Sequence, residues 1–107
     1  MIREESETMP AYRVHLDQRL EESQVPVTLR EGLREYITIR RPVGHFLTAV
    51  LSNDLAGACA RGDEFVLPHL SRIVFFLWNY APGNCWGTSD RVALWLADPN
   101  PPPEVFE

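Results

Sequence analysis

The sequence has no lysine, few cysteines and no long apolar run. All ten basic residues are arginine, so every cation is a planar guanidinium suited to carboxylates and phosphates. The two cysteines, Cys59 and Cys85, form no Cys-x-x-Cys pair, and we expect both to be free thiols. Each apolar stretch ends well short of the roughly 18 residues that a membrane helix needs.

The start of the chain has no secretory signal. Residues 1–7 are acidic and polar, without the basic start and apolar run of a signal peptide. We therefore expect a cytoplasmic protein with no membrane association. The net charge of −5 argues against a nucleic-acid partner, because such proteins usually bring a basic face to the phosphates. It suits solubility or a basic partner surface.

The spacing of the apolar residues predicts an all-α fold. Apolar residues make up 45% of the 107, which is enough for one domain with a real core. They recur every three or four residues and nowhere alternate, so we predict a compact bundle of four or five helices with no sheet. Residues 1–25 should form a polar N-terminal segment or short helix, residues 26–98 the helical core domain, and residues 99–107 a proline-rich tail.

Turn-forming residues set the expected helix ends. Within the core we predict helices over about 29–40 and 45–61, a third from Asp63 to just before Pro82, and a short last helix capped by Thr88 or Ser89. Thr28 and Glu31 have the spacing of a capping box, and Gly62 suits a left-handed C-terminal cap. The helix after Asp63 is apolar nearly all round, so we expect it to be central.

Three stretches carry a resemblance to a known family. They are the run Pro-Val-Gly-His-Phe-Leu-Thr-Ala-Val-Leu-Ser-Asn-Asp-Leu at 42–55, Trp-Asn-Tyr-Ala-Pro at 78–82, and Trp-Gly-Thr at 86–88. Over roughly residues 28–96 the chain resembles a small family of bacteriophage and prophage proteins, although Pro68 departs from its pattern. The resemblance implies no activity. It implies a setting among accessory genes of mobile elements, many of which modulate host functions or block defence systems.

A turn rich in cations is the candidate ligand site. Arg40 and Arg41 precede a helix that begins near Gly44 and His45, and free amides at a helix start attract anions. Asn53 and Asp54 could face the same groove. These six residues predict a site for a phosphate-bearing ligand such as a nucleotide signal. The alternative is that both arginines complement the end of the preceding helix, and that Asn53 and Asp54 lie on a solvated edge or satisfy backbone groups of the neighbouring loop.

A dense group of aromatic residues is the candidate partner-binding region, and it comprises Phe75, Phe76, Trp78, Tyr80, Trp86 and Trp95. Of these we assign Phe75, Phe76, Tyr80 and Trp86 to partner binding. Adjacent residues of a helix cannot both point at the core, so either Phe75 or Phe76 should face outward. An exposed aromatic patch favours contact with a host protein or with a second copy of the chain, and we expect a homo-oligomer. The alternative is that these rings simply fill the core.

The sequence shows no recognisable catalytic, metal-binding or cofactor-binding motif. The three histidines, His15, His45 and His69, share no metal-ligand spacing with one another or with the cysteines. Cys85 with His45 or His69 could form a nucleophile and base, but its neighbours lack the signature of a thiol enzyme. We therefore predict a non-enzymatic interaction protein of phage or prophage type, which inhibits a host defence protein. The alternative function is a sponge that sequesters a nucleotide signal.

Overall fold

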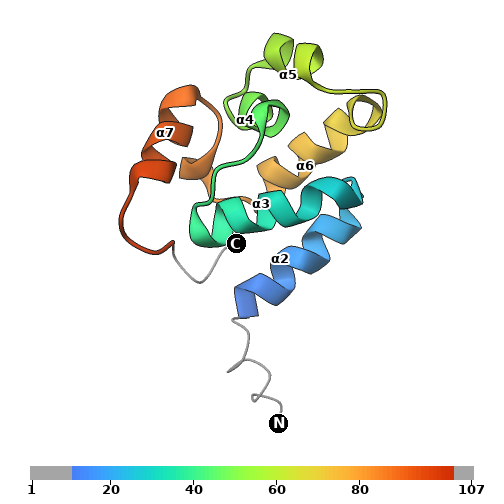
Figure 1. Cartoon of the computed structure of the whole chain (residues 1–107). Coiled ribbons are helices and arrows are strands. Elements are labelled where there is room, and N and C mark those ends of the chain that lie inside the picture. Colours follow the sequence, from blue (N-terminus) through green and yellow to red (C-terminus); the bar gives the residue numbers. More distant parts are fainter. Residues whose placement is uncertain (1–10, 103–107) are drawn as a thin grey trace.

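The computed structural model describes residues 11–102, which are all-α (Figure 1). The elements are α2 (Ala11–Glu22), α3 (Val27–Ile39), α4 (His45–Leu51), α5 (Leu55–Arg61), the 3-10 turn η1 (Leu67–His69), α6 (Leu70–Tyr80), the 3-10 turn η2 (Gly83–Cys85) and α7 (Ser89–Ala97). This part of the chain has no strand, which confirms the all-α prediction. Its six α-helices exceed the predicted four or five. The remaining parts of the predicted N-terminal segment and tail, residues 1–10 and 103–107, lie outside the described residues.

Helices α2 and α3 lie side by side in Figure 1 and are joined by a tight turn. Gln24 adopts a left-handed φ of 61°, and the Val25 amide donates to the Leu20 carbonyl at 3.2 Å. Helix α3 begins at Val27, directly after Pro26, and no side chain caps it. The predicted capping box is therefore wrong, because Thr28 already lies inside the helix.

The helix predicted over residues 45–61 is broken into α4 and α5. Asn53 adopts a left-handed φ of 61°, and the Asp54 amide donates to the Ala49 carbonyl at 2.8 Å. The Asp54 carboxylate then accepts the Gly57 amide at 3.0 Å and caps α5. Asn tolerates the left-handed region and Asp is a preferred N-cap, so these two residues end one helix and begin another.

The central helix starts later than predicted. Asp63 caps a turn by accepting the Phe65 and Val66 amides at 2.9 and 3.1 Å, and Pro68 lies in η1 before α6 begins at Leu70. Gly62 is extended at φ −81°, so its predicted left-handed cap is also wrong. At the last helix Thr88, one of the two predicted caps, is the N-cap, and its hydroxyl accepts the Arg91 amide.

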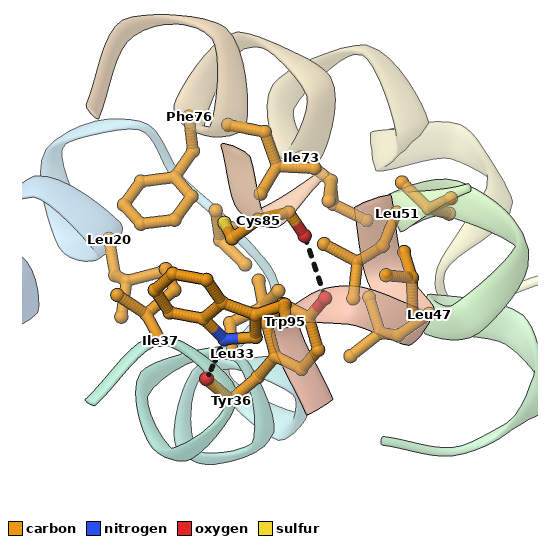
Figure 2. Packing of buried hydrophobic residues seen from close by; sticks show 14 of the residues in the cluster. Leu20, Leu33, Tyr36, Ile37, Leu47, Leu51, Ile73, Phe76, Cys85 and Trp95 are labelled. Carbon is orange, nitrogen blue, oxygen red and sulfur yellow. Dashed lines mark hydrogen bonds between the residues drawn. The ribbon is translucent and has the colours of Figure 1, made fainter. Parts of the chain in front are cut away.

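Hydrogen bonds inside the core join α3, η2 and α7 (Figure 2). The Tyr36 hydroxyl donates to the Cys85 carbonyl at 2.6 Å, and the Trp95 indole donates to the Tyr36 carbonyl at 2.8 Å. Both aromatic rings are buried among aliphatic side chains from α2, α4 and α6. Because these polar groups are satisfied where water is excluded, they fix how the C-terminal elements sit on α3.

Candidate functional site

Helix α6 buries one side and leaves an aromatic side in water. Ile73, Phe76 and Leu77 are fully buried, which anchors the helix in the core. On its other side Val74, Phe75 and Trp78 are 39, 53 and 78% exposed. We call the exposed side the α6 face, and it comprises Ser71, Arg72, Val74, Phe75, Trp78 and Asn79. The expectation that one of the two adjacent phenylalanines faces outward is confirmed for Phe75. The assignment of Phe76 to partner binding is wrong, because its ring lies in the core.

A groove adjoins the α6 face where Trp78 meets Trp86. The two indole rings stand edge to face, with centroids 6.5 Å apart and planes at 84°. They line a hollow of about 480 Å³ together with Val74, Asn53 and Arg91, and we call it the Trp groove. Its remaining lining residues are Ala81, Gly83 and Gly87.

Backbone contacts hold the loop that carries Trp86. The Gly87 amide donates to the Leu51 carbonyl at 2.7 Å, and Gly87 has a φ of 117° that only glycine adopts readily. The Arg91 guanidinium donates to the carbonyls of Gly83 and Trp86 at 3.2 and 3.4 Å. The wall of the Trp groove is therefore preformed rather than dependent on a ligand.

A smaller hollow continues the Trp groove towards α5. Its volume is about 40 Å³, and it shares Asn53 and Val74 with the larger one. Leu55, which is 67% exposed, and Leu70 also line it. The apolar surface thus runs along α6 from Leu70 past Val74 to Trp78.

The predicted partner-binding residues Trp86 and Tyr80 are only partly buried, unlike Phe76. Trp86 lines the Trp groove. Tyr80 is half-buried on the side towards α2, where its ring packs at 6.1 Å from that of Phe76 and the Arg19 guanidinium lies 4.9 Å above it. Sequence reasoning counted Trp78 in the dense aromatic group but did not assign it to partner binding. The helical period did carry a signal, since Trp78 follows Val74 by four residues and Phe75 by three.

The two arginines of the predicted anion site point to different partners. Arg40 Nη1 and Nε donate to the carbonyls of Trp95 and Asn100 at 3.0 and 2.8 Å, and Nη2 pairs with Asp98 at 3.4 Å. Arg41 Nη1 instead pairs with Glu35 at 3.2 Å. The structure therefore does not bring the two guanidinium groups together on one anion.

Three of the other predicted ligand residues do share a hollow. His45, Asn53 and Asp54 border a polar depression of about 550 Å³ between α4, α5 and the start of α7. Arg61 and Ser89 also line it, and so do Thr48, Ala49 and Ser52. Gly44 is the N-cap of α4, and Asp54 already uses its carboxylate as a cap. We call this depression the polar hollow.

Cys85, the candidate nucleophile of the sequence analysis, lies in the core. Cys85 is fully buried, and burial raises the pKa of its thiol to about 12, so it stays protonated and out of reach of a substrate. Burial, with a smaller contribution from Cys85, also raises the pKa of Tyr36. Within residues 11–102 no three His, Cys, Asp or Glu side chains gather as a metal site would require. None of the helices there has the length and apolar composition needed to cross a bilayer.

Comparison with known proteins adds no relative. No protein-family model matches the chain, and no curated protein or solved structure matches it either. The structure itself offers two candidate sites, which are the α6 face with its Trp groove and the polar hollow.

Proposed function

We propose that this protein is a non-enzymatic interaction protein that binds another protein through the α6 face and the Trp groove. The observation that carries the proposal is Trp78, which is 78% exposed although it belongs to the helix that supplies the centre of the core. Tryptophan is the residue type most often found at the energetic centre of protein interfaces. Val74 and Trp86 line the Trp groove with Trp78, and exposed Phe75 follows on the same side of α6, so these apolar side chains do not stand singly.

The rigidity of this surface favours binding. Ile73, Phe76 and Leu77 lock α6 into the core, and the contacts of Gly87 and Arg91 fix the loop behind Trp86. Little conformational entropy would be lost when a partner docks, so more of the hydrophobic gain would appear as affinity.

The residues that line the Trp groove indicate what kind of partner would bind there. Most side chains that line the Trp groove are apolar, and Asn53 and Arg91 add polar groups to the lining. We infer a partner that inserts one or two apolar side chains, in the way an amphipathic helix or an apolar loop does. The net charge of −5 further favours a partner with basic residues around that contact.

The resemblance to phage and prophage proteins supports a biological setting. In this setting the partner is a host protein, and the consequence of binding is inhibition of a defence system. The α6 face is sufficient for such inhibition, because a protein that covers a functional surface of its target needs no catalytic activity.

Co-purification from a bacterial host tests the proposal. Trp78→Ala and Phe75→Ala should each weaken partner capture, by roughly 30-fold or about 2 kcal/mol for Trp78, and relieve any inhibition of defence. Leu94→Ala is the matched control, since Leu94 is 71% exposed on α7 and is not among the residues of either surface. Equal capture by all three variants would contradict the proposal.

The polar hollow supports a second candidate function, the sequestering of a nucleotide signal. Its specific basis is that His45, Asn53 and Asp54 border it together with Arg61, whose guanidinium makes one long contact of 3.5 Å to the Gly57 carbonyl. A thermal-shift screen with cyclic and linear nucleotides tests it. Stabilisation that Arg61→Ala abolishes and Arg41→Ala preserves would support it, and flat curves across the panel would dismiss it.

A further inference from the structure

Helix α6 is nearly free of charge in a strongly charged protein. Charged residues make up 23% of the chain, whereas Arg72 is the one charged residue among the eleven of α6. The α6 face therefore carries no acidic group. Two molecules that each carry a net charge of −5 repel each other, and they can approach most easily where neither presents an acidic group.

The order of side-chain sizes along the α6 face suits pairing with itself. The small Ser71 stands near one end and the large Trp78 near the other, with Val74 and Phe75 between them. If two copies of α6 cross antiparallel about a twofold axis between Val74 and Phe75, Ser71 of each copy lies opposite Trp78 of the other. A large side chain then meets a small one on both sides of the axis, as an isologous interface requires.

The geometry points to a second copy of this chain as the occupant of the α6 face, in an antiparallel α6–α6 pair with Trp78 seated over Ser71 of the other copy. The rows Ser71–Phe75–Asn79 and Leu70–Val74–Trp78 are ridges of residues four apart, which interdigitate when two helices cross at roughly 50°. This inference uses the surface of the proposed function, but it does not require a host partner. A host protein would have to displace the second copy.

The available area predicts an equilibrium rather than a permanent dimer. Trp78 and Phe75 expose roughly 300 Å² between them, taking about 150–250 Å² for each aromatic side chain. A standard interface hides about 800 Å² on each partner, so the rest must come from Val74, Leu55 and the polar rim. We expect association that depends on protein concentration.

The salt dependence has a definite sign. Because the paired face is apolar and the two copies repel each other over their remaining surfaces, added salt should screen that repulsion and tighten the dimer. Pairing through oppositely charged surfaces would instead weaken as salt is added.

Sedimentation equilibrium of the full chain at two salt concentrations tests the inference. We expect the mass to rise with concentration from 12.3 kDa towards twice that value, and more readily at the higher salt concentration. Ser71→Glu places an acidic group opposite Trp78 of the other copy, and it should raise the dissociation constant at least tenfold. Glu suits the first turn of a helix, so this variant should fold. Leu94→Glu adds the same charge on exposed α7 and should change the constant little beyond the general repulsion.

Tryptophan emission provides an independent readout of the same surface. Trp95 is 3% exposed and Trp78 is 78% exposed, so burial of Trp78 should shift the emission to shorter wavelength as the dimer forms. Trp78→Phe should remove most of that shift and leave only the smaller contribution of half-buried Trp86, which lies beside Trp78 in the Trp groove. A monomer at every concentration and salt level, or equal effects of Ser71→Glu and Leu94→Glu, would overturn the inference. Either result would leave host-protein binding untouched, since the co-purification experiment reads it separately.

Discussion

The Arg40 guanidinium contacts three separate parts of the chain. It lies 3.9 Å above the ring of Trp95, donates to the Trp95 and Asn100 carbonyls, and pairs with Asp98. Its side chain is 10% exposed, although the residue sits at the end of α3 in the left-handed region, with a φ of 57°. Glycine would fit that backbone without strain but would supply none of these contacts. One side chain thereby fastens α7 and the start of the proline-rich tail to α3.

Replacement of Arg40 should therefore destabilise the protein, although it lies at the edge of the core. We expect Arg40→Ala to lower the free energy of unfolding by about 2–3 kcal/mol, because the charged hydrogen bonds to the part-buried Trp95 carbonyl and to the Asn100 carbonyl are lost. Arg40→Lys should recover part of this at most, since an ammonium cannot reproduce the planar fork. Urea unfolding measures both. The control is Arg41→Ala, at a side chain 61% exposed, and equal losses for the two alanine variants would contradict this role of Arg40.

The buried thiol of Cys85 predicts a loss of stability at alkaline pH. Burial raises its pKa from 9.0 to about 12, so the fold favours the neutral thiol. This contribution is fully present below 9.0 and is lost as the pH rises towards 12, because only the unfolded chain then releases the proton. The free energy of unfolding should fall by about 1.4 kcal/mol per pH unit in that window.

Urea unfolding at pH values on either side of 9.0 measures this slope. Cys85→Ala should make the fall shallower just above that pH, before ionisation of Tyr36 in the unfolded chain adds its own contribution above 10.0. Cys59→Ala is the control, since Cys59 is exposed in the folded state. A wild-type slope in the Cys85 variant would show that the thiol is not the titrating group.

Among the elements, the boundary between α4 and α5 depends on two polar residues. Asn53 takes the left-handed backbone that ends α4, and Asp54 caps α5 through the Gly57 amide. A Cβ at position 57 would collide with the Asp54 carboxylate, so Gly57 is part of the same cap. The break also places Asn53 beside both the Trp groove and the polar hollow.

Loss of the Asp54 cap should be measurable as a modest destabilisation. We expect Asp54→Ala to lower the free energy of unfolding by about 1 kcal/mol, whereas Asp54→Asn should remain close to the wild type because its amide oxygen still accepts the Gly57 amide. Chemical denaturation of the two variants in parallel tests this. Equal destabilisation by both would mean that the charge, and not the cap, stabilises this turn.

The helix ends that could be predicted from the sequence are those set by local chemistry. Pro82 and the Thr88 cap set two of them, because fixed φ angles and capping side chains act within a few residues. The helical spacing of apolar residues continues across the polar residues 52–54, since Leu55 follows Leu51 by four. The spacing therefore gave no sign of the break that Asn53 makes. The polar triplet Ser-Asn-Asp was the local signal for a turn there.

At the scale of the whole molecule, the candidate sites depend on contacts that no local pattern encodes. An outward-facing phenylalanine could be predicted from the spacing along α6, but Trp78 and Trp86 meet only through the loop that Gly87 ties to α4. The Arg40–Arg41 pair looked like one cationic turn because the residues are adjacent. Tertiary structure separates them, since Asp98 draws one guanidinium to the C-terminal segment and Glu35 holds the other.

The most direct test of the central claim is photo-crosslinking inside a bacterial host, with a photoreactive phenylalanine analogue in place of Trp78. The same substitution at Leu94, 71% exposed on α7, is the control. We predict protein crosslinks from position 78 that are absent from position 94, with twice the chain mass marking self-pairing and any other mass marking a host partner. No crosslink from position 78, or the same products from both positions, would contradict the claim that the α6 face is the binding surface.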